Sequence, residues 1–437
     1  MRARAAPGVR AAVGQAVAEC GDAAEVKAVA LAAQSGSTVP VGPDGRPNRV
    51  ITWMDTRAQP VVDSWSDTVR ARVRSISGWS PGAGVGLATI AWLHRSSSGS
   101  NSSTGSTRSL ERWASVDDHL VHELTGSWVT NPSNAAGMQL MDARELQWSP
   151  ELCDLVDIDP GRLSRIAPSG EDLGSVAGRG EAFGLGRDVR LIVGGHDQAC
   201  AALGLGALDP GDIVLSGGTA WVLSVITPLV RVESLPAGFN LSPHVADQRW
   251  SASRNLGPLG AVLASCLSAV DSADLERELA SIAPSEDDHH FVPNLVDPER
   301  TTWGELIGAG PDPGPIGRTR AAFEACAFAV RHTIDQAPTP PGDRSSITFV
   351  GGGTRSRHLC QQIADATSRQ VLIFPDASWP AIGAARIAAT ASGLPFTVAS
   401  PSEPSMSPLR VDPRPDIDGI GERRYFAHRQ LISGDQP

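Results

Sequence analysis

Apolar residues in the first half of the chain follow two different periods. The runs "EVKAVALAA", which breaks at Gln34, and "RLIVGG" at 190–195 are compact and apolar, so each predicts a buried strand. Alanine and valine recur on one face between Val9 and Ala18, which predicts a helix. A further helix is expected over "VDDHLVHELT", with a stop at Gly126. This half therefore predicts strands covered by helices.

The second half repeats this alternation. After the small-residue helix expected over "ACAALGLGAL", proline and glycine predict a turn at "DPGD", residues 209–212. The segments "IVLS" and "WVLSVI" flank Gly-Gly-Thr and predict a hairpin. Strand and helix patterns then alternate through "ITFV", "LCQQIADAT", "QVLIF" and "AIGAARIAATASG". Both halves thus predict α/β layers.

The length of 437 residues favours more than one hydrophobic core. We expect a first domain over residues 1–207, a second over 208–395, and a Pro/Ser-rich tail over 396–437 that is only partly ordered. The stretch "SSSGSNSSTGSTRS" cannot bury apolar surface, so it predicts a flexible surface loop without chemistry.

Charge and composition restrict the partners. The net charge of -11 argues against sequence-independent nucleic-acid binding, which needs a basic surface. Lys27 is the only lysine, which excludes a GxxxxGK[ST] phosphate loop. Bound phosphate would then need backbone N–H groups, a metal or arginine. An apolar run of 18 residues is absent, so we expect no membrane partner.

The six cysteines are scattered and form no CxxC pair, which indicates reduced, buried thiols and a cytoplasmic location. His119 and His122 lie three residues apart without a third ligand, so we expect solvated side chains and no metal site. His196 is expected to be a mere neighbour of Asp197, since adjacent side chains generally point apart. The sequence is compatible with a homodimer but does not require one.

Three glycine-rich stretches are the candidates for chemistry. Asp197 in "GGHDQACAALG" follows a predicted strand, where it could act as a general base; the alternative is a helix N-cap. The "SGGT" stretch at 216–219 can aim backbone N–H groups at an anion, or can be an ordinary hairpin turn. The "GGGTRS" stretch at 351–356 lies between a strand and a helix, a setting that suits a nucleotide, although its spacing is not GxGxxG.

Taken in chain order, these segments resemble the FGGY carbohydrate kinase family. The resemblance runs from about residue 28 to 393. The matching segments are "AAQSGSTVPV" with "ITWMDTRA", "LTGSWVTNPSNAAGMQLMD", "GGHDQACAALG", "SGGTAW", "FVPNLVDPER", "RAAFEACAFAVRH", and "GGGTRSRHLCQQIADATSRQV" followed by "AIGAA".

The resemblance implies two actin-like, ribonuclease-H-like α/β domains around a nucleotide cleft. It implies ATP-dependent phosphorylation of a small sugar or polyol, a pentulose such as xylulose first, with ATP and Mg²⁺ as cofactors and Asp197 as the general base. The pair Asp197-Gln198 is also similar to the glycerol kinase branch. The substrate-binding residues it implies are Gln34, Ser35, Gly36, Trp53, Asp55, Arg57 and Gln198. The ATP-binding residues it implies are Gly217, Gly218, Thr219, Gly351, Gly352, Gly353 and Thr354.

One part of the family pattern is missing from this sequence. Family members begin with a strand and a D-x-G-T turn whose aspartate organises Mg²⁺, whereas here the sugar loop already comes at Gln34. The "DLGS" stretch at 172–175 is no substitute, because we expect it in a Gly/Ser loop. Without these strands, the first sheet should have an unpaired edge and an uncovered apolar face.

Two interpretations of this gap compete, and we favour the first. Either the protein starts upstream of Met1, or the chain is a truncated relative that binds sugar with weak or no kinase activity. An actin-like ATPase without a sugar substrate is a third hypothesis, because one fold can host several functions.

Overall fold

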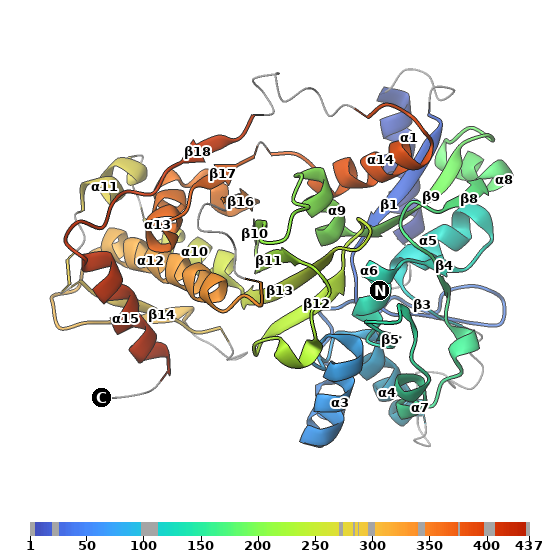
Figure 1. The fold of residues 1–437 in the computed structure, drawn as a ribbon, viewed down its shortest axis with the longest axis horizontal. Helices are drawn as coiled ribbons and strands as arrows, with labels where there is room; N and C mark the ends of the chain where they lie inside the picture. Colours follow the sequence, from blue (N-terminus) through green and yellow to red (C-terminus); the bar gives the residue numbers. More distant parts are fainter. Residues whose placement is uncertain are drawn as a thin grey trace.

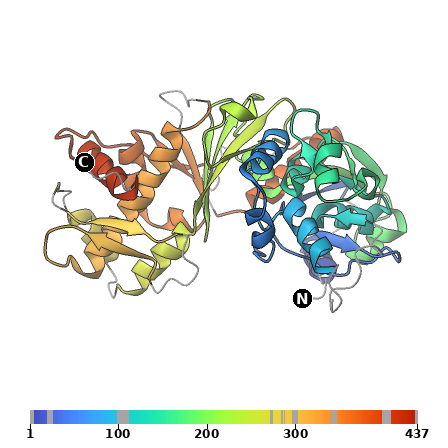
Figure 2. The ribbon, with the colours of Figure 1, turned by 90° about the horizontal axis from the view of Figure 1, so that it is seen from below.

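The chain forms two α/β bodies in the computed structural model, separated along the long axis of the molecule (Figures 1 and 2). The α/β expectation is confirmed. Among the described residues, no helix has both the length and the apolarity needed to cross a membrane. The described residues are 5–19, 26–97, 112–270, 274–282, 285–286, 288–295, 302–339, 346–374, 376–396 and 407–433, so the Ser/Gly stretch near residue 100 lies largely outside them.

The first body is built on three strands in the order β1-β9-β8. β1 (Ala28–Ala33) runs parallel to β9 (Arg190–His196), and β8 (Asp172–Ser175) pairs antiparallel with the other edge of β9. β1 is thus an edge strand within the described part of the chain, as the sequence predicts. The expected loop at 172–175 is wrong, because these residues form β8 and Asp172 pairs with Arg190 at 2.6 Å.

Helices cover both faces of this sheet. On one face, Val9 and Val13 of α1 (Ala5–Glu19) pack in the same apolar cluster as Val29 and Leu31 of β1. α5 (Val116–Thr125) contacts β1, β8 and β9 and adds Val121 and Leu124 to this cluster, whereas α1 packs mainly on residues 181–183. The apolar face that we expected to be uncovered is therefore partly covered, and residues 28–32 of β1 are half-buried.

The opposite face carries α9 (Asp197–Gly204) and α14 (Trp379–Ala391), which pack closely on each other and on β1 (Figure 1). A Cβ at Gly383 would overlap the carbonyl group of Cys200, so glycine is what lets the helices approach. α14 follows the last parallel strand of the second body, yet it packs on the first. By its contacts α14 belongs to the first body, whereas the expected division at residue 208 places it in the second domain.

The remainder of the first body surrounds a separate apolar cluster that includes Leu87, Ile90 and Trp113. Its helices are α2 (Gln59–Asp63), α3 (Asp67–Ser77), α4 (Gly86–Ser97), α5 (Val116–Thr125), α6 (Pro132–Met138), α7 (Pro150–Leu155) and α8 (Ala177–Gly180). Its short strands are β2 (Val39–Val41), β3 (Arg112–Ala114), β4 (Val129–Thr130), β5 (Met141–Asp142), β6 (Gln147–Trp148) and β7 (Arg165–Ile166).

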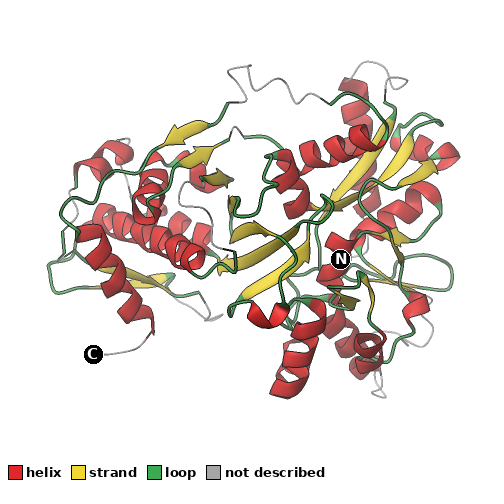
Figure 3. Cartoon of the chain, viewed as in Figure 1, coloured by secondary structure: helices red, strands yellow, loops and turns green. Residues whose placement is uncertain are grey.

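The second body contains a seven-stranded sheet in the order β12-β13-β11-β10-β16-β17-β18, with helices packed against it (Figure 3). β10, β16 and β17 are parallel, and the other neighbouring pairs are antiparallel. The expected hairpin around Gly-Gly-Thr is confirmed by β10 and β11. The strands are β10 (Ile213–Gly217), β11 (Trp221–Thr227), β12 (Phe239–Pro243), β13 (Trp250–Gly257), β16 (Ile347–Val350), β17 (Val371–Ile373) and β18 (Leu409–Val411).

The core of the second body lies between this sheet and α12, around the fully buried side chains of Trp221, Phe323 and Phe349. Five described cysteines are buried free thiols, as expected, and Cys20 lies outside the described residues. The remaining elements are α10 (Leu259–Ser268), α11 (Leu275–Ser281), α12 (Gly314–Asp335), α13 (Arg357–Thr367) and α15 (Ile420–Ser433), with the hairpin β14 (His290–Pro293) and β15 (Gly304–Ile307).

Residues 407–433, which the structure describes within the expected partly ordered tail, are folded onto the second body. Residues 409–411 form the edge strand β18, and α15 packs on α12 and α13. The side chain of Arg424 is 2% exposed; its Nε donates to Glu324 at 2.8 Å and its Nη1 donates to the Ser285 carbonyl at 2.9 Å. A buried ion pair of this kind is costly to break, so the described part of this segment belongs to the second body.

The two bodies meet where α3 ends beside β12. The Leu241 amide donates to the Gly78 carbonyl at 2.9 Å, and Arg74 donates to the Leu235 carbonyl at 3.0 Å. β12 belongs to the second sheet, so this contact fixes how one face of that sheet is presented to the first body.

Candidate active site

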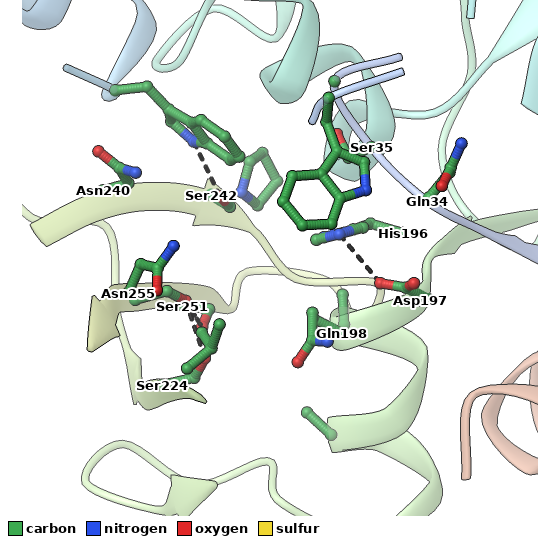
Figure 4. Close-up of a pocket in the computed structure, with 18 of the residues that line it drawn as sticks. Gln34, Ser35, His196, Asp197, Gln198, Ser224, Asn240, Ser242, Ser251 and Asn255 are labelled. Carbon is green, nitrogen blue, oxygen red and sulfur yellow. Dashed lines mark hydrogen bonds and ion pairs between the residues drawn. The ribbon is translucent and has the colours of Figure 1, made fainter. Parts of the chain in front are cut away.

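Asp197 occupies the first position of α9, directly after β9. The N-cap is His196, with extended φ and ψ of -61° and 139° and no side-chain cap bond, so the N-cap alternative for Asp197 is wrong. The Asp197 carboxylate is 36% exposed and lies 3.1 Å from His196 Nε2. The expectation that the two side chains point apart is also wrong, because the change from strand to helix between them turns both toward one side (Figure 4).

The backbone that carries this pair is held by buried polar groups. The His196 amide donates to Ser133 Oγ at 2.9 Å, and Ser133 Oγ donates to Asn131 Oδ1 at 2.7 Å. Asn131 Nδ2 in turn lies 3.4 Å from Asp117 Oδ2, which also accepts from Thr130 Oγ1 at 2.7 Å. Burial raises the pKa of Asp117, and hydrogen bonds from Ser115 and Thr130 partly oppose the rise. We call Asp117, Asn131 and Ser133 the buried relay.

Of the expected sugar-binding residues, Gln34, Ser35, Gly36, Trp53 and Gln198 line a cavity of about 330 Å³ together with Asp197. The loop after β1 carries Gln34, Ser35 and Gly36 and is held by a hydrogen bond to α6 and by its own backbone geometry. Ser35 Oγ donates to the Asn134 carbonyl at 3.1 Å, and Gly36 has a φ of +83° that favours glycine. The structure therefore brings these five predicted residues together around one cavity.

Asp55 and Arg57 do not line the cavity. Arg57 forms an ion pair with Asp55 at 2.5 Å, and its guanidinium lies over the Trp92 ring, 4.5 Å from the centroid. The Arg57 hydrogen bond holds the pKa of Asp55 below its usual value. Both side chains thus brace the loop that carries Trp53.

The opposite wall of the cavity comes from the second body and was missed in the sequence. It is formed by side chains of β11, β12 and β13 that face the first body (Figure 4). The alternation of residues could have predicted this polar face, because every second residue in "FNLSP" and "WSASRNL" is serine or asparagine and alternate residues of a strand share one face. Its polar members are Ser224, Asn240, Ser242, Ser251, Ser253 and Asn255.

The two glycine turns expected to contact ATP lie side by side. β10 and β16 are parallel neighbours, so the turns that follow them emerge at the same sheet edge. A Cβ at Gly351 would lie 3.0 Å from the carbonyl carbon and oxygen of Gly217, and a Cβ at Gly260 would overlap the Gly218 carbonyl. Val222, three residues beyond Thr219, lines the cavity, which places this edge next to it.

The N-terminus of α13 is already satisfied within the chain. Glu276 accepts from Ser356 Oγ at 2.6 Å and from the His358 amide at 2.8 Å. A carboxylate at a helix N-terminus takes the place that a phosphate would use. The first glycine turn, 217–219, is therefore the better phosphate candidate, and the second turn is left for the nucleoside.

The described residues contain no group of three His, Cys, Asp or Glu side chains that could hold a metal ion. His119 and His122 are not solvated as we expected: His119 is buried, and the His122 ring stacks on Trp128 at 4.0 Å between centroids. A divalent ion that enters with a nucleotide would be held mainly by the phosphates of that nucleotide, a mode of binding that suits Mg²⁺.

Two α/β bodies with a cleft between them and paired glycine turns at a sheet edge define the class of actin-like, ATP-dependent phosphotransferases. The N-terminal domain model of the FGGY family of carbohydrate kinases matches residues 9–204, and the C-terminal domain model matches residues 237–392. The chain belongs to the FGGY family of carbohydrate kinases. The expected fold and enzyme class are confirmed.

The names of known relatives refer to different acceptors. Xylulose kinase from Lactococcus lactis is 25% identical over 85% of this chain and 75% of its own length, and glycerol kinase from Thermococcus kodakarensis is 25% identical over 84% and 74%. Among solved structures, a Brucella ovis "xyloylose kinase" aligns with a TM-score of 0.80 and 21% identity, covering 96% of this chain and 86% of that one. A gluconate kinase from Lactobacillus acidophilus aligns at 0.82 and 18%, covering 98% and 87%.

Proposed function

We propose that the chain transfers the γ-phosphate of ATP to a hydroxyl group of a small sugar or polyol, with a pentulose such as xylulose as the first choice. The single observation that carries the proposal is the Asp197 carboxylate, held by His196 at 3.1 Å in the wall of the cleft cavity. The xylulose kinases among the relatives support the pentulose.

Each part of the site has one task in this reaction. Asp197 accepts the proton of the acceptor hydroxyl as its oxygen attacks the γ-phosphate. Gln34 and Gln198 offer amide groups to neighbouring hydroxyls, and the Trp53 ring offers an apolar face. Backbone N–H groups of the 217–219 turn face the β- and γ-phosphates, and Mg²⁺ bound with the nucleotide would supply charge neutralisation.

Catalysis by positioning requires the cleft to exclude water. The acceptor cavity has walls from both bodies, so closing one body on the other encloses the acceptor. The hydrogen bonds of the buried relay to the His196 backbone keep the base in place while the bodies move.

The test is Asp197→Asn, which keeps the shape of the side chain and removes the base. We expect acceptor-dependent ADP release with xylulose to fall at least about 1000-fold, while the melting temperature changes little. Asp188→Asn, at an exposed position outside the cavity, is the matched control and should keep wild-type activity. Full activity in Asp197→Asn would refute the assignment.

A second candidate is a relative that binds sugar without phosphorylating it. The cavity that would hold the sugar is lined by residues of both bodies, which is all that this alternative requires. It predicts that xylulose raises the melting temperature of the wild type while no ADP forms. ADP release at the same rate with and without sugar would instead indicate an ATPase that does not use a sugar.

A further inference from the structure

The polar wall of the second body is ordered by strand register. On β11, Leu223 and its alternate neighbours are buried in the core, so Ser224 faces the other side of the sheet. Ser224 pairs with Ser253 of β13, and Ser253 pairs with Asn240 of β12. Three polar side chains thus form one row across three strands. With Ser242, Ser251 and Asn255 they form the serine–asparagine face.

Hydrogen bonds within the chain fix the orientation of these side chains. Asn255 Oδ1 accepts from the Gly257 amide at 2.8 Å, and Asn240 Oδ1 accepts from the Ser80 amide at 3.2 Å. Each asparagine oxygen is therefore used, and each amide nitrogen remains as a donor on the side of the cavity. Ser253 Oγ lies 2.8 Å from Ser224 Oγ and 3.1 Å from Ser251 Oγ, so the three hydroxyls form a chain whose two ends can still bind a further hydroxyl group.

The charge of the cavity restricts what can bind. Among the described residues that line it there is no lysine or arginine, and Asp197 is the only carboxylate. His244 at the end of the face is neutral at pH 7, because burial lowers its pKa to about 4. An anionic group on the acceptor would find no lysine or arginine in the cavity to pair with. Carboxylates and phosphates are usually bound by arginine, so a charged acceptor fits this cavity poorly.

Small neutral donors and acceptors spaced along three strands match a row of hydroxyl groups. An apolar face would be expected if the two bodies simply packed together here, and a charged one if the face were only solvated. Figure 4 shows the face across the cavity from His196, Asp197 and Gln198. One acceptor can therefore touch both walls, with its reacting hydroxyl at Asp197.

We infer that the serine–asparagine face is the second wall of the acceptor site and selects an uncharged, polyhydroxylated acceptor by binding hydroxyl groups remote from the one that reacts. The inference rests on the proposed function for its kinase readout, but the binding that it describes does not require turnover.

The test is the double variant Ser224→Ala/Ser253→Ala, which removes two hydroxyls that bond each other. Ser251 Oγ loses its contact with Ser253 but lines the cavity, where water can replace that contact. We expect the KM for xylulose to rise about tenfold, at roughly three- to tenfold per lost hydrogen bond, with the KM for ATP unchanged. The matched control is Thr227→Val/Thr339→Val, which removes a hydroxyl pair 2.6 Å apart that lies outside the cavity lining. This control should keep the wild-type KM.

Binding is measured separately, as the shift in melting temperature caused by glycerol, xylulose, fructose or gluconate without nucleotide. At least one neutral acceptor should stabilise the wild type and the control but not Ser224→Ala/Ser253→Ala, and gluconate should stabilise none. If a neutral acceptor stabilises the wild type and the control but not the double variant, and no ADP is released, the proposed function is refuted and this inference is still supported. An unchanged KM and thermal shift in the double variant, stabilisation by gluconate, or no stabilisation by any neutral acceptor would overturn it.

Discussion

At the scale of single residues, the site depends on the junction between β9 and α9. A side chain at the first position of a helix that follows a strand is aimed by the backbone turn rather than by its own rotamer alone. His196 and Asp197 use this junction to place an imidazole nitrogen against a carboxylate oxygen at 3.1 Å. The carboxylate is thereby held in one orientation toward the cavity, although 36% of it is exposed.

Replacing His196 with phenylalanine keeps an aromatic ring and removes the nitrogen that lies 3.1 Å from the Asp197 carboxylate. We expect kcat with xylulose to fall about 10- to 100-fold, because the base loses its fixed orientation, while the KM for ATP stays unchanged. Steady-state ADP release at saturating sugar measures both. Equal losses in kcat and in ATP affinity would show instead that the variant disturbs the whole cleft.

At the scale of elements, the apolar period of the sequence predicted β1, β9, β10, β11, β16 and α13 because each is governed by burial over a short range. The same reasoning failed for β8, where "DLGS" has little apolar content and forms a strand only because β9 offers an edge. Reasoning from the apolar period also missed the serine–asparagine face, because the sequence near a strand does not show which other part of the molecule its polar face will contact. Asp197 and the glycine turns were candidates from the local sequence, each with an ordinary structural alternative, whereas the sugar loop and the role of every site residue came from resemblance to the family.

The contact between α12 and α15 makes stability depend on pH. Burial, together with the neighbouring groups His290, Arg424 and Arg429, lowers the pKa of His428 to about 3. The folded state therefore keeps this imidazole neutral, while the unfolded chain takes up a proton below the ordinary value of 6.5. Its stabilising effect is complete above pH 6.5 and is lost as the pH falls toward 3, by ~1.4 kcal/mol for each pH unit at most.

Urea unfolding at pH 7.5 and 5.0 measures this dependence. The wild type should lose free energy of unfolding between the two values, and His428→Gln should lose less, because glutamine does not titrate. Ile432→Gln, which places a glutamine at an exposed position of the same helix and removes no titrating group, is the control. The same loss in His428→Gln and in the wild type would contradict the assignment.

At the scale of the whole molecule, the chain crosses between the two bodies more than once. It leaves the first body after α9, builds the second sheet through β17, and returns so that α14 can pack on α9 and β1. It then crosses again to β18 and α15. Each body is thus assembled from segments that are distant in sequence, which a single boundary near residue 208 cannot describe.

Gly383→Ala tests the return crossing. Its Cβ would overlap the Cys200 carbonyl group, so we expect the variant to lose about 1–3 kcal/mol of unfolding free energy in urea. Gly178→Ala is the control, since a Cβ there has no atom within 4 Å, and it should be neutral or slightly stabilising. No loss in Gly383→Ala would mean that α14 is not tightly docked.

The late position of α14 also fixes an order of events on the ribosome. β1 and β9 are synthesised long before residues 379–391, so the alanine-rich side of β1 emerges without the helix that finally covers it. The second body is almost fully translated before the first can be completed. The first body therefore stays incomplete until α14 has been synthesised, and the apolar surface exposed until then favours aggregation of the nascent chain.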